Sequence, residues 1–290
     1  MRAAGEGDAA SSFQLVAAVG NQAPPAPPGA ADVALWRAAP VAFVSDSGGC
    51  EAMLRRLRGC PLLGFAMQLQ YTAADSGELR PALLQIAAPP RPRAAGAGGG
   101  GAQAVVYVID ALQAAAAAAL APGGGLKALL EDNRVIKAMR GSIQVDAVLQ
   151  LGVGIRLAGA FDVQWAAMTL RSHTANSAAA ADSGAAALGA LCAEWGLPHP
   201  WDGEAAPVLD GDDERPWLRR PPSRTLIDAA AEHVRYLVPL ATRLRERCVA
   251  AANPLLNAAH ARAAGGAPPP APAAAGGLAA ALGGGGRAAK

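Results

Sequence analysis

The sequence predicts an α/β domain in which a mixed sheet is flanked by helices, and two series of elements support this prediction. Three apolar strands follow one another in the first half of the chain, at 61–70, 82–88 and 104–110. A helix, a strand, a helix, a short strand and a further helix then succeed one another between residues 126 and 170. Adjacent strands followed by alternating helices and strands are typical of a sheet with helices packed on its faces.

The chain begins with a segment of small, polar and proline residues, so we expect a flexible leader at residues 1–38. A short strand at 42–44 then opens the folded domain, which we place at residues 40–252. The next helix carries apolar residues at helical spacing. It is expected to start at Asp46 or Ser47, whose side-chain oxygens suit an N-cap.

Segments without a periodic pattern separate the three strands. Residues 71–80 are polar and contain Gly77, which favours a turn. Residues 89–102 are rich in proline and glycine, which indicates a disordered insertion. The alanine-rich run 111–121 has a high intrinsic helix propensity, and the glycines at 123–125 end it.

The central segment of the chain has the clearest periodicity. Apolar residues repeat at helical spacing at 126–130 and again at 145–151, and the run 135–139 between them is typical of a short buried strand. Glycines end the second of these helices. Asp162 is expected to cap the helix that follows the next short strand.

The last third of the chain is less regular. A helix is expected at 178–191, followed by an irregular connector with an acidic turn. Apolar residues then recur at helical spacing over 227–249, which predicts one long helix. Residues 253–290 are rich in alanine, proline and glycine, and we expect a disordered tail there.

Composition narrows the classes of function. The formal net charge is +2, so the balance of the whole chain does not indicate a polyanion partner. The four cysteines form no CxxC pair, which disfavours a zinc site and favours free thiols in a reducing compartment. No segment is apolar enough to span a membrane, and the N-terminus is a poor secretory or transit signal. We expect the cytoplasm or the nucleus, with an organelle left open.

The run LLEDNRVIKAMRGSIQVDAVLQLGVGIRLAGAFDVQWA, residues 129–166, resembles the 3′–5′ exonuclease domain of the RNase D type, in the DEDD superfamily. The strands ALLQIAA and AVVYVID and the helical run AAAEHVRYLVPL resemble further segments of the same domain. The resemblance covers about residues 40–250 and implies a ribonuclease-H-like fold for the mixed sheet.

Members of this family hold two divalent metal ions with four carboxylates, and a tyrosine orients the attacking water. By this resemblance, the positions of the four acids are occupied here by Ala66 and Gln68 on the first strand, Val145 in a helix and His233 in the last helix. The position of the tyrosine is occupied by Ala229. None of these residues supplies the carboxylates that Mg²⁺ prefers. We therefore expect no bound metal and an inactive member of the family. Egalitarian-like proteins are an example of such inactive members, because their domain serves as an RNA-binding or adaptor module.

The same substitutions favour nucleic-acid binding. A groove that has lost four carboxylates is less negative and therefore more favourable to phosphate. Five basic residues are candidates for lining it: Lys137, Arg140, Arg219, Arg220 and Arg235. For any one of them, a solvated surface charge is the commoner role. The expected ligand is a single-stranded nucleic acid, with RNA as the first choice.

Two alternatives stay open. The chain could be an active, Mg²⁺- or Mn²⁺-dependent 3′–5′ exonuclease that uses the displaced acids Asp146 and Glu232. Each lies one residue from a family position, and one step along a helix rotates a side chain by about 100°. The chain could instead be a structural subunit that recruits protein partners through the proline-rich runs Pro24–Pro28 and Pro268–Pro270.

Overall fold

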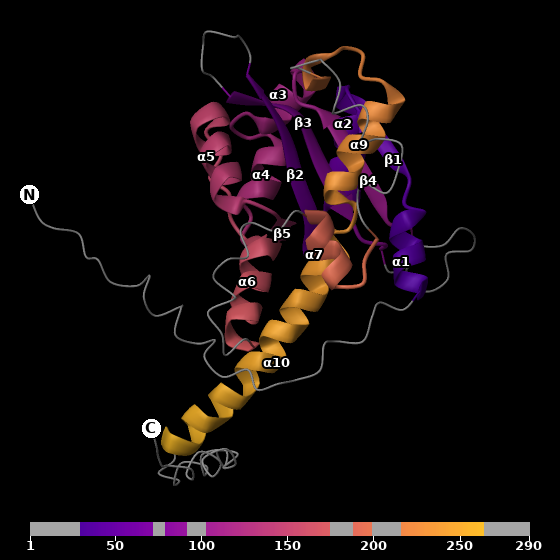
Figure 1. The fold of residues 1–290 in the computed structure, drawn as a ribbon. Helices are drawn as coiled ribbons and strands as arrows, with labels where there is room; N and C mark the ends of the chain where they lie inside the picture. Colours follow the sequence, from indigo (N-terminus) through magenta and orange to yellow (C-terminus); the bar gives the residue numbers. More distant parts are fainter. Residues whose placement is uncertain (1–29, 72–78, 92–102, 175–187, 199–215, 264–290) are drawn as a thin grey trace, which may run out of the picture.

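Residues 30–71, 79–91, 103–174, 188–198 and 216–263 are described by the computed structural model. Within them the chain forms a mixed sheet with helices on both faces, which confirms the predicted α/β class (Figure 1). The expected turn, the insertion, most of the leader and the end of the tail fall largely outside the described residues, as do both proline-rich runs. The strands are β1 (Val41–Val44), β2 (Leu62–Tyr71), β3 (Leu79–Ala88), β4 (Val105–Asp110), β5 (Ile136–Met139) and β6 (Ala160–Asp162).

The strands of the described sheet lie in the order β1-β4-β3-β2-β5-β6. Strand β3 runs antiparallel to its neighbours β2 and β4. The outer pairs β1–β4, β2–β5 and β5–β6 are parallel. One antiparallel strand between parallel ones is the arrangement expected of a ribonuclease-H-like sheet, so the fold implied by the resemblance is confirmed.

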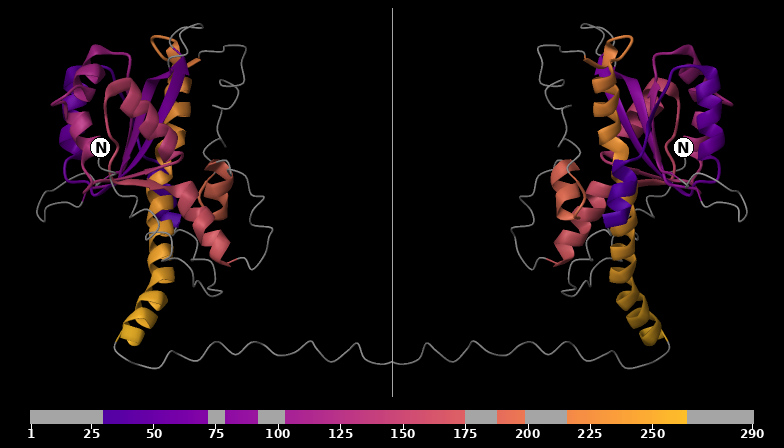
Figure 2. Two further views of the ribbon diagram at one scale, coloured as in Figure 1. Left: turned by 90° about the vertical axis from the view of Figure 1, so that its left-hand side faces the viewer. Right: turned by 90° about the vertical axis from the view of Figure 1, so that its right-hand side faces the viewer.

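Each face of the sheet has its own hydrophobic core, because side chains alternate between the two faces along every strand. One face is covered by α2 (Ser47–Leu57), α3 (Ala114–Leu120), α4 (Gly125–Glu131) and α5 (Ser142–Val153). The other is covered by α1 (Ala30–Arg37), α6 (Val163–Thr174), α7 (Leu188–Glu194), the 3-10 helix η3 (Pro216–Leu218), α9 (Arg224–Arg235) and α10 (Leu237–Ala263) (Figures 1 and 2). Strands β2 and β3 lie at the centre, with α9 directly above them.

Two helix caps agree with their prediction. Asp46 accepts the backbone N–H of Gly49 at 2.8 Å and so caps α2. Asp162 accepts the N–H of Gln164 at 3.0 Å in the first turn of α6. Its second oxygen accepts the N–H of Ser142 at 2.7 Å, which joins the first turns of α5 and α6.

The N-terminal boundary of the domain differs from the expected one. Residues 30–37 form α1, although we expected a flexible leader up to residue 38. Trp36 in this helix is buried in the core shared with α9 and α10. Val33 and Leu35 pack against the same core, so the buried Trp36 side chain and these two residues dock the short helix.

The C-terminal helix also differs. The single helix expected at 227–249 is divided at Tyr236 into α9 and α10. Pro239 causes this break, because in a continuous helix its ring would clash with the carbonyl of Arg235. Helix α10 then continues to Ala263, beyond the expected start of the tail, and extends away from the sheet (Figure 2).

The remaining expectations concern the helix at 178–191 and the four cysteines. The helix expected at 178–191 is described only from residue 188, where α7 starts. The four cysteines carry free thiols. No helix in the described part of the chain is long and apolar enough to cross a membrane.

Candidate functional site

The first two family positions lie side by side on β2. Ala66 and Gln68 are two residues apart, so they project from the same face of the sheet. In the antiparallel neighbour β3, Ala66 pairs with Gln85 and Gln68 pairs with Leu83. Ala66 packs against the core beneath α9. The residues that stand for the first two acids are therefore together at the expected place, and neither can ionise.

Gln85, opposite Ala66, is an unexpected member of this site. Its side chain is completely buried, and neither amide atom has a hydrogen-bond partner among the described residues. The methyl group of Ala66 can neither donate nor accept a hydrogen bond. Gln85 was not among the predicted site residues, although a single polar side chain within the apolar run 82–88 is a visible signal in the sequence.

Helix α9 positions the last family motif. Its N-cap is Ser223, whose hydroxyl accepts the N–H of Leu226 at 3.2 Å. A Cβ atom on Gly64 of β2 would lie 3.1 Å from the carbonyl oxygen of Val234, so glycine allows the helix to approach the strand closely. Ala229, at the position of the family tyrosine, is completely buried in the core between α9 and the sheet.

His233 replaces the fourth acid, one helical turn after Ala229. Its ring meets that of Trp217 in an edge-on arrangement, with centroids 6.4 Å apart and an interplanar angle of 67°. Burial, together with the positive charge of Arg140, lowers the pKa of His233 to about 4. The imidazole is therefore neutral at pH 7, where the family has a negative charge.

The remaining acid position is Val145 in α5. Val145 belongs to the core on the opposite face of the sheet, together with Met139 and Leu149. The neighbouring Asp146 accepts the backbone N–H of Leu157 at 2.9 Å. This displaced acid therefore holds the segment after α5 against its own helix.

The second displaced acid, Glu232, pairs with Arg235 in the next turn of α9, with 2.5 Å between Oε1 and Nε. Burial raises the pKa of Glu232, and the charge of Arg235 opposes this rise. Arg235 also donates hydrogen bonds to the carbonyl oxygens of Trp36 and Ala39 at 3.1 and 2.9 Å. With 7% of its surface exposed, Arg235 links α9 to α1, which differs from the predicted contact with nucleic acid.

The side chains at the family positions do not fit a pair of magnesium ions. Mg²⁺ requires oxygen ligands, usually carboxylates and water, in a near-octahedral arrangement. The four positions present a methyl, an amide, an isopropyl and a neutral imidazole group. Among the residues that the structure describes, no three His, Cys, Asp or Glu side chains are grouped closely enough to hold a metal ion.

Lys137, another predicted nucleic-acid contact, is instead buried and bonded to other residues of the domain. It lies in β5 with 1% of its surface exposed. Its ammonium group donates to the carbonyl oxygens of Asp132 at 2.8 Å and Leu129 at 3.4 Å, at the C-terminal end of α4. A cation is favourable at this end of a helix. Burial lowers the pKa of Lys137 to about 8.

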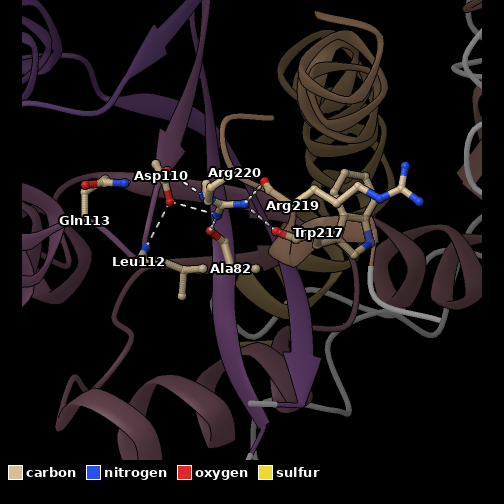
Figure 3. Close-up of polar contacts among 7 residues, drawn as sticks. All are labelled: Ala82, Asp110, Leu112, Gln113, Trp217, Arg219 and Arg220. Carbon is tan, nitrogen blue, oxygen red and sulfur yellow. Dashed lines mark hydrogen bonds and ion pairs between the residues drawn. The ribbon is translucent and has the colours of Figure 1, made fainter. Parts of the chain in front are cut away.

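Arg220 is likewise held by the protein. Its guanidinium makes a two-point ion pair with Asp110, at 2.7 Å from Nε to Oδ2 and 2.8 Å from Nη2 to Oδ1 (Figure 3). It also donates to the carbonyl oxygens of Ala82, Trp217 and Arg219. Arg220 therefore attaches the segment that contains η3 to the end of β4, and it is not available in the predicted role.

Arg140 and Arg219 remain as exposed basic residues at the site. Arg140 directly follows β5 and is close enough to His233 to lower the pKa of that imidazole. Arg219 follows η3, and its side chain points away from the Asp110–Arg220 pair (Figure 3). Two of the five predicted basic contacts thus lie on the surface beside the family positions.

This architecture shares its fold with solved exonuclease structures of the RNase D type. RNase D of Trypanosoma brucei, solved in complex with RNA U12, superposes with a TM-score of 0.56 and 18% identity, over 74% of this chain and 65% of that one. The chain thus spans slightly less than two thirds of the length of that RNase D. No protein-family model matches the sequence, and comparison with curated proteins gives no match.

Two other exonuclease structures share the fold. The EXO domain of Aedes aegypti Nibbler has a TM-score of 0.51 and 16% identity, over 75% of this chain and 94% of that domain. The catalytic core of RRP6 from Trypanosoma brucei has a TM-score of 0.50 and 15% identity, over 84% of this chain and 55% of that core. The predicted resemblance is therefore confirmed at the level of the fold.

Proposed function

We propose that this chain binds single-stranded RNA through an exonuclease-like domain that does not cleave phosphodiester bonds. The observation that carries the proposal is the neutrality of the four positions at which the family has acids. Cleavage in this family needs two metal ions to stabilise the attacking and leaving oxygens. Ala66, Gln68, Val145 and neutral His233 provide no negative charge to hold them.

The surroundings of His233 support binding of a phosphodiester strand. Arg140 lies close enough to act on His233 electrostatically, and Arg219 is two residues from Trp217, which contacts the imidazole ring. Exposed guanidinium groups pair well with phosphate because they present several N–H donors in a plane. RNA is the proposed nucleic acid because the RNase D of similar fold was solved with RNA.

The test uses the full chain and a 5′-labelled single-stranded RNA, first with Mg²⁺ and then with Mn²⁺. Shortening of the RNA and retention on a filter are measured on the same samples. Binding without shortening is the expected result. Arg140→Gln should weaken binding, whereas Arg134→Gln, which changes an exposed arginine at the other end of β5, should not.

Two results would overturn the proposal. Stepwise shortening that is lost in Asp146→Ala or Glu232→Ala would establish a metal-dependent exonuclease built on the displaced acids. Neither binding nor shortening would favour a partner-binding subunit, with the proline-rich runs at 24–28 and 268–270 as the first segments to delete.

A further inference from the structure

Trp165 is a large aromatic residue on the surface of the domain. It lies in the first turn of α6 with 53% of its surface exposed, whereas Trp36 and Trp217 are buried. Ile143, in the first turn of α5, is 69% exposed. Exposed apolar residues gathered at one place often mark a binding surface.

The sheet brings these residues to the edge where β5 and β6 end. The strands are parallel, and Met139 pairs with Asp162, so Arg140 and the first turn of α6 follow at the same edge. The Asp162 carboxylate accepts the N–H of Ser142 at 2.7 Å and that of Trp165 at 3.3 Å. The first turns of α5 and α6 therefore start beside each other, next to Arg140.

The charged groups at this edge are the Asp162 carboxylate and the Arg140 guanidinium, and of the two only Arg140 is exposed. Both oxygens of Asp162 are engaged by backbone N–H groups, and the other residues in the first turns of α5 and α6 are uncharged. Arg140 is exposed and makes no hydrogen bond or ion pair with the residues that the structure describes. The exposed guanidinium thus lies beside an aromatic and an aliphatic side chain, on a surface that adjoins His233, and the nearby Asp162 carboxylate is held by backbone N–H groups.

We propose that Trp165 stacks on a base of the bound strand while Arg140 contacts a neighbouring phosphate. The proposal rests on the RNA-binding function and adds one contact for the strand beside the degenerate site. Aromatic rings bind bases of any sequence because every base has a π-face. The expected ligand is therefore single-stranded nucleic acid with little sequence preference at this contact.

The experiment measures anisotropy of a labelled oligouridine with the full chain and its variants. Trp165→Leu keeps an apolar side chain but removes the aromatic ring, and it should weaken binding roughly 5- to 100-fold. Trp165→Phe should bind within about threefold of wild type because it can still stack. Val249→Ala, a change at another exposed apolar residue on α10, should have no effect.

A ribose-phosphate oligomer without bases separates stacking from charge. Trp165→Leu should bind this oligomer as wild type does, while Arg140→Gln should bind both oligomers more weakly. If wild type binds oligouridine and Trp165→Leu binds it equally well, the stacking proposal fails and the RNA-binding function stands; an exposed Trp165 would then indicate a protein-docking surface. If wild type binds neither oligomer, the RNA-binding function fails, and this proposal fails with it.

Discussion

Arg220 and Asp110, far apart in the sequence, form a two-point ion pair that holds η3 against the end of β4. The side chain of Asp110 is 2% exposed and that of Arg220 is 20% exposed, so the pair is largely removed from water. Asp110 also accepts the N–H of Leu112 at 3.1 Å. Because Trp217 lies in η3 and contacts His233, this pair positions one wall of the candidate site.

The first prediction concerns the stability of this pair. Arg220→Met should lower the free energy of unfolding by about 3–5 kcal/mol, because it leaves the buried Asp110 carboxylate without its partner. Urea denaturation followed by circular dichroism measures the change. Asp110→Leu in the Arg220→Met background should recover part of the loss, since it removes the unpaired charge.

Arg224 provides the matched control. It pairs with Asp228 in the next turn of α9, and both side chains are well exposed. Arg224→Met should change the free energy of unfolding by no more than about 0.5 kcal/mol. Equal losses of unfolding free energy in Arg220→Met and Arg224→Met would show that the Arg220–Asp110 pair stabilises the fold no more than an exposed ion pair does.

The second prediction concerns Gln85. Its amide is buried without a partner among the described residues, opposite Ala66. Gln85→Met keeps a similar length and removes the amide, so it should raise the free energy of unfolding by about 1–2 kcal/mol. Gln150→Met, at an exposed position on α5, should be nearly neutral. A loss of stability in Gln85→Met would mean that a buried water satisfies the amide.

The elements of the fold were predictable because their signals are local. Strand β3 is apolar over most of its length, α5 has a helical stripe ended by glycine, and Asp46 and Asp162 have side chains that suit helix caps. The division of the last helix also had a local signal in Pro239. The packing of α1 through Trp36 had no local signal in the sequence, because that contact depends on α9 and α10.

The roles of the basic residues were less predictable. Arg220 pairs with Asp110 on β4, and Arg235 donates hydrogen bonds to carbonyl oxygens in and after α1. Both sets of partners are far away in the sequence. A long charged side chain can reach several partners, and only the tertiary structure decides among them. Ala66 on β2 and the His233 motif on α9 lie on one face of the sheet, whereas Val145 lies in the core on the other face.

The third prediction separates a surface arginine from a structural one. Arg219→Gln should weaken RNA binding severalfold and reduce the slope of log K against log salt by about 1, because one phosphate contact is lost. Its loss of unfolding free energy should be smaller than that of Arg235→Met, since Arg219 is exposed and Arg235 is buried. Arg235→Met should instead destabilise the domain, because it leaves Glu232 and the carbonyls of Trp36 and Ala39 without their donor. The reverse pattern would contradict both assignments.

The last prediction follows from the buried imidazole of His233, whose pKa of about 4 lies below the ordinary histidine value near 6.5. Between these two pH values the unfolded chain binds a proton at this residue and the folded chain does not. Stability is therefore full above about pH 6.5 and falls as the pH drops to about 4 and below, by about 3 kcal/mol in total. His233→Gln should remove this part of the pH dependence, measured as the difference in urea unfolding between variant and wild type.

Arg140→Gln should reduce the same pH dependence, because the pKa of His233 rises when the nearby positive charge is lost. Parallel profiles for wild type and His233→Gln would show that the imidazole is as accessible to protons in the folded domain as in the unfolded chain.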